Sequence, residues 1–132
     1  MKPAEQYAKM LEAEGLLAQT DSDGTLHFKY EGDNYELLTY ADDLQYVGIR
    51  ANYQLLAGVR RSHAVTEAND VTRRAKVAKV FLLSNRAVTI AAELFIGEPE
   101  HLDAILYRLI RLVQSVSCDY FSRLAKHVPV SA

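Results

Sequence analysis

Four histidines are the first residues to test for chemistry, because imidazole binds metals and exchanges protons near neutral pH. They stand far apart in the chain, as His27, His63, His101 and His127. Two metal ligands on one helical face need a spacing of three or four residues, and no pair of these histidines has it. The sequence therefore predicts no metal site, and with no glycine loop that would cradle a phosphate it predicts no cofactor.

Paired acidic residues are the next candidates. Asp21-Ser22-Asp23-Gly24 resembles the start of a calcium loop, but the twelfth position, which needs a bidentate glutamate, is Gly32. The adjacent pair Asp42-Asp43 does not suit acid–base catalysis, since neighbouring side chains in a turn diverge. Both segments are therefore interpreted as turns.

Nucleophiles give no stronger signal. Ser84, Ser115 and Ser117 do not occur in a G-x-S-x-G motif. The single cysteine, Cys118, follows Arg111 by two helical turns, and that cation would favour a thiolate, although a lone cysteine on a helix is more often a packing or interface residue. The sequence thus predicts no catalytic residue.

Charge is strongly segregated along the chain, although the net charge is only −2. Residues 21–43 hold seven acids and one lysine, whereas residues 50–86 hold eight bases and two acids. Solvated faces are one explanation, and complementary surfaces that meet within a chain or across a dimer are another. Phosphate contacts along Arg60 to Lys79 are a third, but the acidic half would repel nucleic acid, so no nucleic-acid partner is expected.

The element that must position any site is the long stretch from Glu100 to Lys126, which has the period of an amphipathic helix. Pro99 marks its start, and Pro129 lies just beyond its end. Its apolar half-cylinder needs a sheet or another helix beneath it.

The rest of the chain supplies such a sheet. Helical spacing predicts helices over Ala4–Glu14 and Ser62–Lys76, with Ser62 as the N-cap of the second. Alternation and turn residues predict five strands, over Leu26–Tyr30, Tyr35–Tyr40, Tyr46–Tyr53, Lys79–Leu83 and Ala87–Ile96. The order is α-β-β-β-α-β-β-α in one domain, residues 1–132. This order indicates an α+β fold with a five-stranded, largely antiparallel sheet and helices packed on one face.

The first strand of the last hairpin is apolar on both faces, and helices on one side can cover only one of them. Either Phe81, Leu83 and Phe95 or Val80, Leu82 and Leu94 then lie on the uncovered side. Such a patch is a liability in a monomer, so we expect a homodimer. The residues predicted to form an interface or to bind a client are Phe81, Leu83, Phe95, Tyr46, Arg73 and Arg74.

Composition fits a small cytoplasmic protein. The 132 residues are 49% hydrophobic, enough for one core. The first residues lack the apolar run of a secretory signal, and no stretch reaches the length of about 20 apolar residues that crosses a bilayer. We therefore expect cytoplasmic localisation and no membrane contact.

Several segments resemble the YbjN-like proteins, a bacterial family labelled as sensory transduction regulators. The resemblance runs from about Leu11 to Leu124. It is carried by Leu11-Glu12-Ala13-Glu14-Gly15, Asp21-Ser22-Asp23-Gly24, Phe28-Lys29-Tyr30-Glu31-Gly32, Tyr35, Ala68-Asn69-Asp70-Val71-Thr72-Arg73, Lys76-Val77-Ala78-Lys79-Val80-Phe81 and Glu93-Leu94-Phe95. Thr72 stands where the family pattern has asparagine. The resemblance implies the fold of the type III secretion chaperones, small cytoplasmic proteins that usually pair as homodimers and bind extended segments of client proteins.

These observations together favour a non-enzymatic protein-binding module, chaperone-like or regulatory, that acts as a homodimer and takes a protein or peptide client. A regulator that binds a small molecule or nucleotide is the alternative, and a small enzyme is the third interpretation.

Overall fold

A computed structural model describes residues 2–128 of the chain, so Pro129 lies outside the described residues. The fold is α+β, as predicted, and its sheet is antiparallel in the order β1-β2-β3-β4-β6-β5. The strands are β1 (Gln19–Thr20), β2 (Leu26–Tyr30), β3 (Asp33–Thr39), β4 (Tyr46–Gln54), β5 (Ala78–Leu82) and β6 (Ala87–Phe95). The prediction of five strands was wrong, because the two-residue β1 was missed.

Turn chemistry sets the register of the first hairpin. Glu31 and Gly32 connect β2 to β3 in two residues, both with positive φ (49° and 87°). Such a turn matches the twist of the two strands. The residues on either side of it, Tyr30 and Asp33, form the first hydrogen-bonded pair of the hairpin. The register then places Phe28 opposite Tyr35, and their rings stack.

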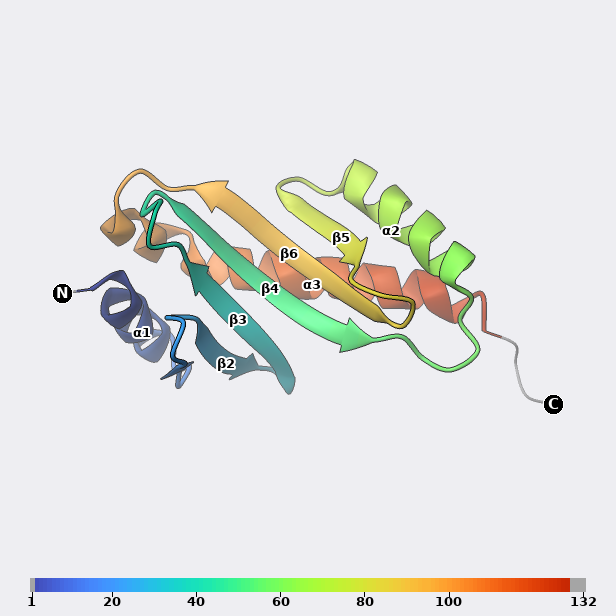
Figure 1. Ribbon diagram of the computed structural model, residues 1–132, viewed down its shortest axis with the longest axis horizontal. Helices are drawn as coiled ribbons and strands as arrows, with labels where there is room; N and C mark the ends of the chain where they lie inside the picture. The colour runs from blue at the N-terminus through green and yellow to red at the C-terminus, as the bar shows by residue number, and fades with distance from the viewer. Residues whose placement is uncertain (1, 129–132) are drawn as a thin grey trace.

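One long helix crosses the sheet. α3 (Leu106–Ala125) runs behind the strands in Figure 1 and buries the predicted apolar stripe against them. The predicted single helix from Glu100 to Lys126 is corrected at its start, where η1 (Pro99–Ala104) is a 3-10 helix. Ile105 (φ −123°, ψ −5°) leaves helical geometry between the two. No helix among residues 2–128 is long and apolar enough to span a bilayer.

Two shorter helices flank α3. α1 (Pro3–Ala13) buries Tyr7 and Leu11 beside η1 and β1, and α2 (Arg61–Arg74) packs on β5 and α3. Arg60, and not the predicted Ser62, is the N-cap of α2, and its side chain donates no capping bond. In Figure 1 the face of the sheet opposite α3 carries no helix among the described residues; we call it the outer face.

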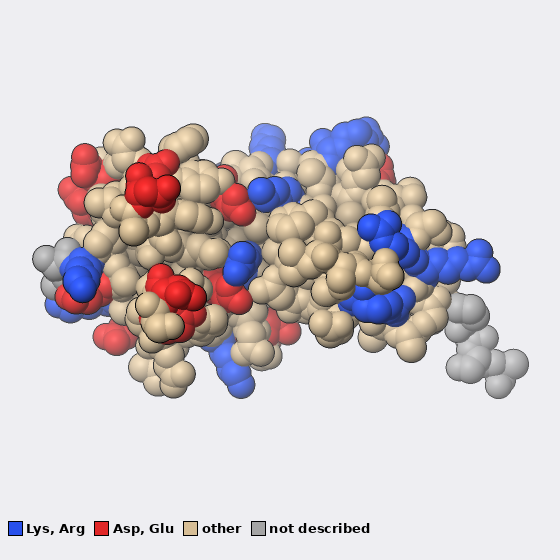
Figure 2. Space-filling view, in the orientation of Figure 1, with Lys and Arg blue, Asp and Glu red and all other residues tan. Residues whose placement is uncertain are grey.

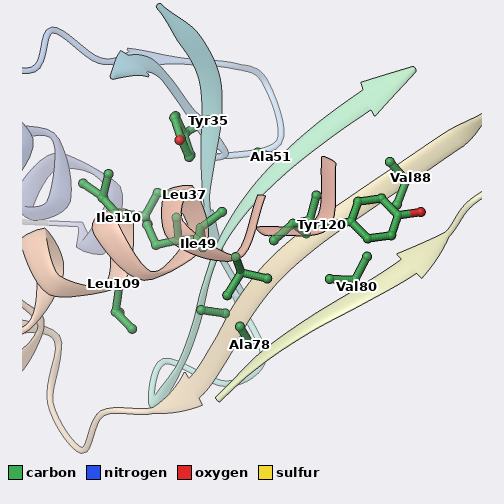
Figure 3. Packing of buried hydrophobic residues seen from close by; sticks show 14 of the residues in the cluster. Tyr35, Leu37, Ile49, Ala51, Ala78, Val80, Val88, Leu109, Ile110 and Tyr120 are labelled. Atoms are coloured by element: carbon green, nitrogen blue, oxygen red, sulfur yellow. The ribbon is translucent and has the colours of Figure 1, made fainter. Parts of the chain in front are cut away.

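The core lies between the sheet and α3. Figure 3 shows Val80 and Val88 from the last two strands near Tyr120 of α3, with Leu37 and Ile49 near Ile110. The inner set of the last hairpin is Val80, Leu82 and Leu94, which pack in or against this core. Phe81, Leu83 and Phe95 therefore belong to the outward set, and this settles an alternative that the sequence left open.

Candidate protein-binding site

One edge of the sheet has an unpaired stretch of backbone on β2. Hydrogen-bonded pairs alternate in an antiparallel ladder, so the pair Tyr30–Asp33 places the backbone N–H and C=O of Lys29 away from β3. β1 pairs only with His27 and Leu26. Among residues 2–128 no backbone group pairs with Lys29 on that side.

A groove of about 500 Å³ lies beside this edge. Its lining consists of Gly15, Leu16, Leu17, Gln19, His27, Phe28, Lys29, Asn34, Tyr35, Glu36 and Asn52. Leu17 is 76% exposed, although it would stand opposite Lys29 if β1 continued along β2 in the same register. The groove thus combines a free strand edge with an exposed apolar side chain and polar residues.

At the opposite edge of the sheet, α2 closes β5 at Val80. The Val80 N–H donates to Thr72 Oγ1 at 2.8 Å, and the same hydroxyl donates to the Val80 C=O at 3.3 Å. One side chain therefore satisfies both backbone groups that Val80 directs away from β6. Thr72 therefore has a polar role at the junction of α2 and β5. Leu82 also directs its backbone away from β6, because Leu83 bonds to Ala87, and no backbone group pairs with it among the described residues. The β5 edge is therefore closed at Val80, whereas the β2 edge is open at Lys29 beside a groove.

The outer face carries an aromatic row at one end. The Tyr46 ring lies 5.1 Å from both the Tyr40 ring and the Phe95 ring, measured between centroids, and Phe95 is 73% exposed. The Tyr46 hydroxyl donates to Glu93 Oε2 at 2.6 Å. This hydrogen bond to Glu93, together with burial, raises the pKa of Tyr46 to about 12.

The predicted patch of Phe81, Leu83 and Phe95 is not continuous. Phe81 lies opposite Thr89 in the register of β5 and β6, six residues from Phe95 along β6. The ion pair of Lys79 with Glu93, at 3.2 Å, occupies the intervening surface. Leu83 follows the end of β5 and is 60% exposed. The outer face thus has apolar groups at both ends and charged groups between them.

Arg73 and Arg74, the other predicted interface residues, lie on α2 and not on the outer face. Both pair with Asp70, at 2.7 Å and 2.9 Å, and Arg123 of α3 reaches the same carboxylate at 3.1 Å. These partners, led by the hydrogen bond from Arg73, hold the pKa of Asp70 below its usual range. The two arginines therefore pair within α2, and Arg123 links the same carboxylate to α3. The structure does not bring Arg73 and Arg74 together with Phe81 and Tyr46.

The segregated charges of the sequence are also separated in space. In Figure 2 most acidic side chains lie over the left half of the molecule and most basic ones over the right half. The two groups meet within the sheet, where Arg50 pairs with Glu36 at 2.9 Å. Among the described residues no cluster of three or more His, Cys, Asp or Glu is arranged to hold a metal ion. Cys118 is exposed on α3.

Sequence reasoning missed the groove and the free edge of β2. The only local signal was the shortness of the segment between Gly15 and the turn at Asp21, which leaves little chain to pair with β2. A free edge is a property of strand order, and no residue type reports it.

Comparison with known proteins finds similarity in structure and not in sequence. No protein-family model and no curated protein sequence matches the chain. YbjN from E. coli, described as a candidate transcription regulator, superimposes with a TM-score of 0.69 at 10% identity, over 96% of this chain and 95% of that one.

Two type III secretion chaperones also share the fold. SycH from Yersinia pestis, solved with a fragment of YscM2, has a TM-score of 0.57 at 13% identity, over 87% of this chain and 99% of that one. SchA, solved as a chaperone–effector complex with HopA1, has a TM-score of 0.56 at 8% identity, over 85% and 91%. The expected likeness is confirmed at the level of the fold: this chain folds like YbjN and the type III secretion chaperones.

Proposed function

We propose that this chain is a protein-binding module with a chaperone-like role, that it acts as a homodimer, and that it holds an extended client segment along β2. The observation that carries the proposal is the free backbone of Lys29 beside a groove lined by both apolar and polar residues. An extended peptide can add a strand to such an edge, with main-chain hydrogen bonds giving affinity and alternate side chains giving specificity. The chaperones that share this fold were solved with protein partners, which supports a binding role.

The groove also predicts which clients fit. A strand added beside β2 would direct alternate side chains to the two sides of the sheet. One set would lie near Leu16 and Phe28, which are apolar, and the other near His27 and Lys29. We therefore expect clients with apolar and polar residues in alternation, bound without chemical change.

A proline substitution tests the proposal. Lys29→Pro removes the free N–H, and proline is tolerated on an edge strand where the N–H faces solvent. Peptides selected on the wild-type protein from a random display library should bind Lys29→Ala nearly as well as wild type. They should bind Lys29→Pro about tenfold more weakly, because the peptide acceptor that bonded to the Lys29 N–H is then partly buried without a partner. Leaving such an acceptor unpaired costs about 1–3 kcal/mol.

The control is thermal unfolding of both variants, which should show the same folded state. Equal peptide affinity for Lys29→Pro and Lys29→Ala would place the client elsewhere and refute strand addition at β2.

A small-molecule ligand is the second candidate, because a volume of about 500 Å³ lies within the range of ligand pockets. Mass spectrometry of the protein purified under native conditions distinguishes the two candidates. A stoichiometric metabolite that competes with the selected peptides would favour this alternative.

A further inference from the structure

The outer face carries an acid and two bases on two adjacent rows. A row is here the set of outward side chains that lie side by side across neighbouring strands. Glu93 lies on the row of Gly48, and the next row holds Arg50, Ala91 and Lys79 across β4, β6 and β5. Glu93 accepts from Lys79 Nζ at 3.2 Å within the chain. These rows of opposite charge are two residue pairs apart, with the pair Ile49–Ala92 between them, and they allow a second copy to meet this surface with unlike charges in contact.

The same face alternates small and large side chains. Gly48, Thr89 and Ala91 are almost fully buried although they face outward, because larger neighbours stand over them. A Cβ atom on Gly48 would meet Glu93 Cγ at 3.2 Å. The larger groups are Tyr46 and Phe95 at one end of the strands and Phe81 towards the other. Two such surfaces can interdigitate as layers of a core do.

We propose that a second copy of this chain docks on the outer face about a two-fold axis that runs across the strands, between the rows of Gly48 and Arg50. This inference rests on the homodimer of the proposed function and specifies its surface and register. Because the axis reverses the strand direction, each row of one copy faces a row of the partner. The two rows lie at the same distance from the axis, on its two sides. Glu93 then lies opposite the partner's Ala91, between the partner's Arg50 and the partner's Lys79.

The apolar ends of the face meet in the same arrangement. Phe95 stands three residue pairs from the axis on one side, and Thr89, with Phe81 beside it on β5, stands three pairs away on the other. Phe95 therefore faces the partner's Thr89 next to the partner's Phe81. Both contacts occur twice, as an isologous interface requires.

The strands of the face supply part of the area of a stable dimer. β3, β4 and β6, with 7, 9 and 9 residues, extend to both sides of the axis, whereas β2 and β5, with 5 residues each, begin at it. Strands about 4.8 Å apart with a rise of about 3.3 Å per residue give the five strands about 550 Å² in projection. A standard interface buries about 800 Å² per partner, so side chains that rise above the strands, such as Phe95, must supply the rest.

Charge reversal tests the register. Glu93→Lys and Lys79→Glu should each lose the dimer, because like charges then meet at both symmetric contacts. Mixing the two variants should restore a dimer, since positions 93 and 79 then carry unlike charges at both symmetric contacts. The lysine of Glu93→Lys still meets Arg50 of the other copy, so the mixed dimer should be weaker than the wild-type dimer. Sedimentation at micromolar concentration should give twice the 14.8 kDa mass for wild type and for the mixture, and 14.8 kDa for each variant alone.

Lys76→Glu is the matched control, because Lys76 is exposed outside the strands and should leave the dimer intact. Circular dichroism should show that all variants are folded. A monomeric wild type would overturn both the homodimer and this inference, while peptide binding at β2 is tested separately. A wild-type dimer whose charge-reversed variants stay dimeric would overturn this surface alone, and a mixture that stays monomeric would overturn the register.

Discussion

Thr72→Val should destabilise the protein far more than its size suggests. Valine keeps the shape of threonine and a similar helix propensity, so the change removes only the hydroxyl. That hydroxyl accepts from the Val80 N–H at 2.8 Å and donates to the Val80 C=O at 3.3 Å, and Val80 is only 6% exposed. Both backbone groups of Val80 would lose their partner at the β5 edge.

The magnitude follows from those two bonds. A hydrogen bond contributes about 0.5–1.5 kcal/mol net, and a buried donor left unsatisfied costs about 1–3 kcal/mol. The hydroxyl lies at a partly buried position where water can replace some of the loss, so we expect a decrease of about 2 kcal/mol in the free energy of unfolding. That is a substantial part of the 5–15 kcal/mol that is typical of a domain.

Urea unfolding measures this effect, with Thr66→Val as the matched control. Thr66 is exposed on the same helix, so the same chemical change there should alter the free energy by less than about 0.5 kcal/mol. The slope of the transition should stay constant in both variants. If Thr72→Val were no more destabilising than Thr66→Val, Thr72 would not close the β5 edge.

Two further predictions concern α3 and its link to α2. Leu109→Ala, at a position only 5% exposed, should reduce the free energy of unfolding by about 2–5 kcal/mol. Arg108→Ala, on the exposed side of the same helix, should be nearly neutral. Similar effects of the two variants in urea unfolding would contradict the packing of α3. The pKa of Asp70 in the folded protein lies below 3.8, the ordinary value for an aspartate. The stabilisation from this carboxylate is therefore present above about pH 4 and is lost as pH falls through the folded pKa. Asp70→Asn should therefore be less stable than wild type at neutral pH and equally stable in acid, and a difference that stayed constant over a pH series would refute the ionic link.

Much of the fold could be predicted, because the residue pattern of most segments matches the side of the helix or strand that is buried in the structure. Alternation gave β2 and β4 within a residue of their ends, and the apolar stripe of α3 faces the sheet as expected. The two-residue β1 was beyond such reasoning, because two residues carry no period. The 3-10 geometry of η1 was missed for a related reason, since six residues are too few for their spacing to distinguish a 3-10 helix from an α-helix.

The candidate site was less predictable. β5 and β6 carry apolar side chains on both faces, so only the packed structure shows that Phe81 and Phe95 point outward. Their separation by Lys79 and Glu93 depends on the register, which sequence spacing does not reveal. The pairing of Arg73 and Arg74 with Asp70 could have been foreseen, since these residues are three and four positions apart on a predicted helix.

Amide hydrogen exchange at Lys29 tests the central claim most directly. The wild-type protein is measured alone and saturated with a display-selected peptide. The free N–H of Lys29 should exchange rapidly without peptide and become protected when the peptide adds a strand, while the Val80 N–H, already bonded to Thr72, should change little. Protection that appears on the outer face or on α2 and leaves Lys29 unchanged would contradict the account.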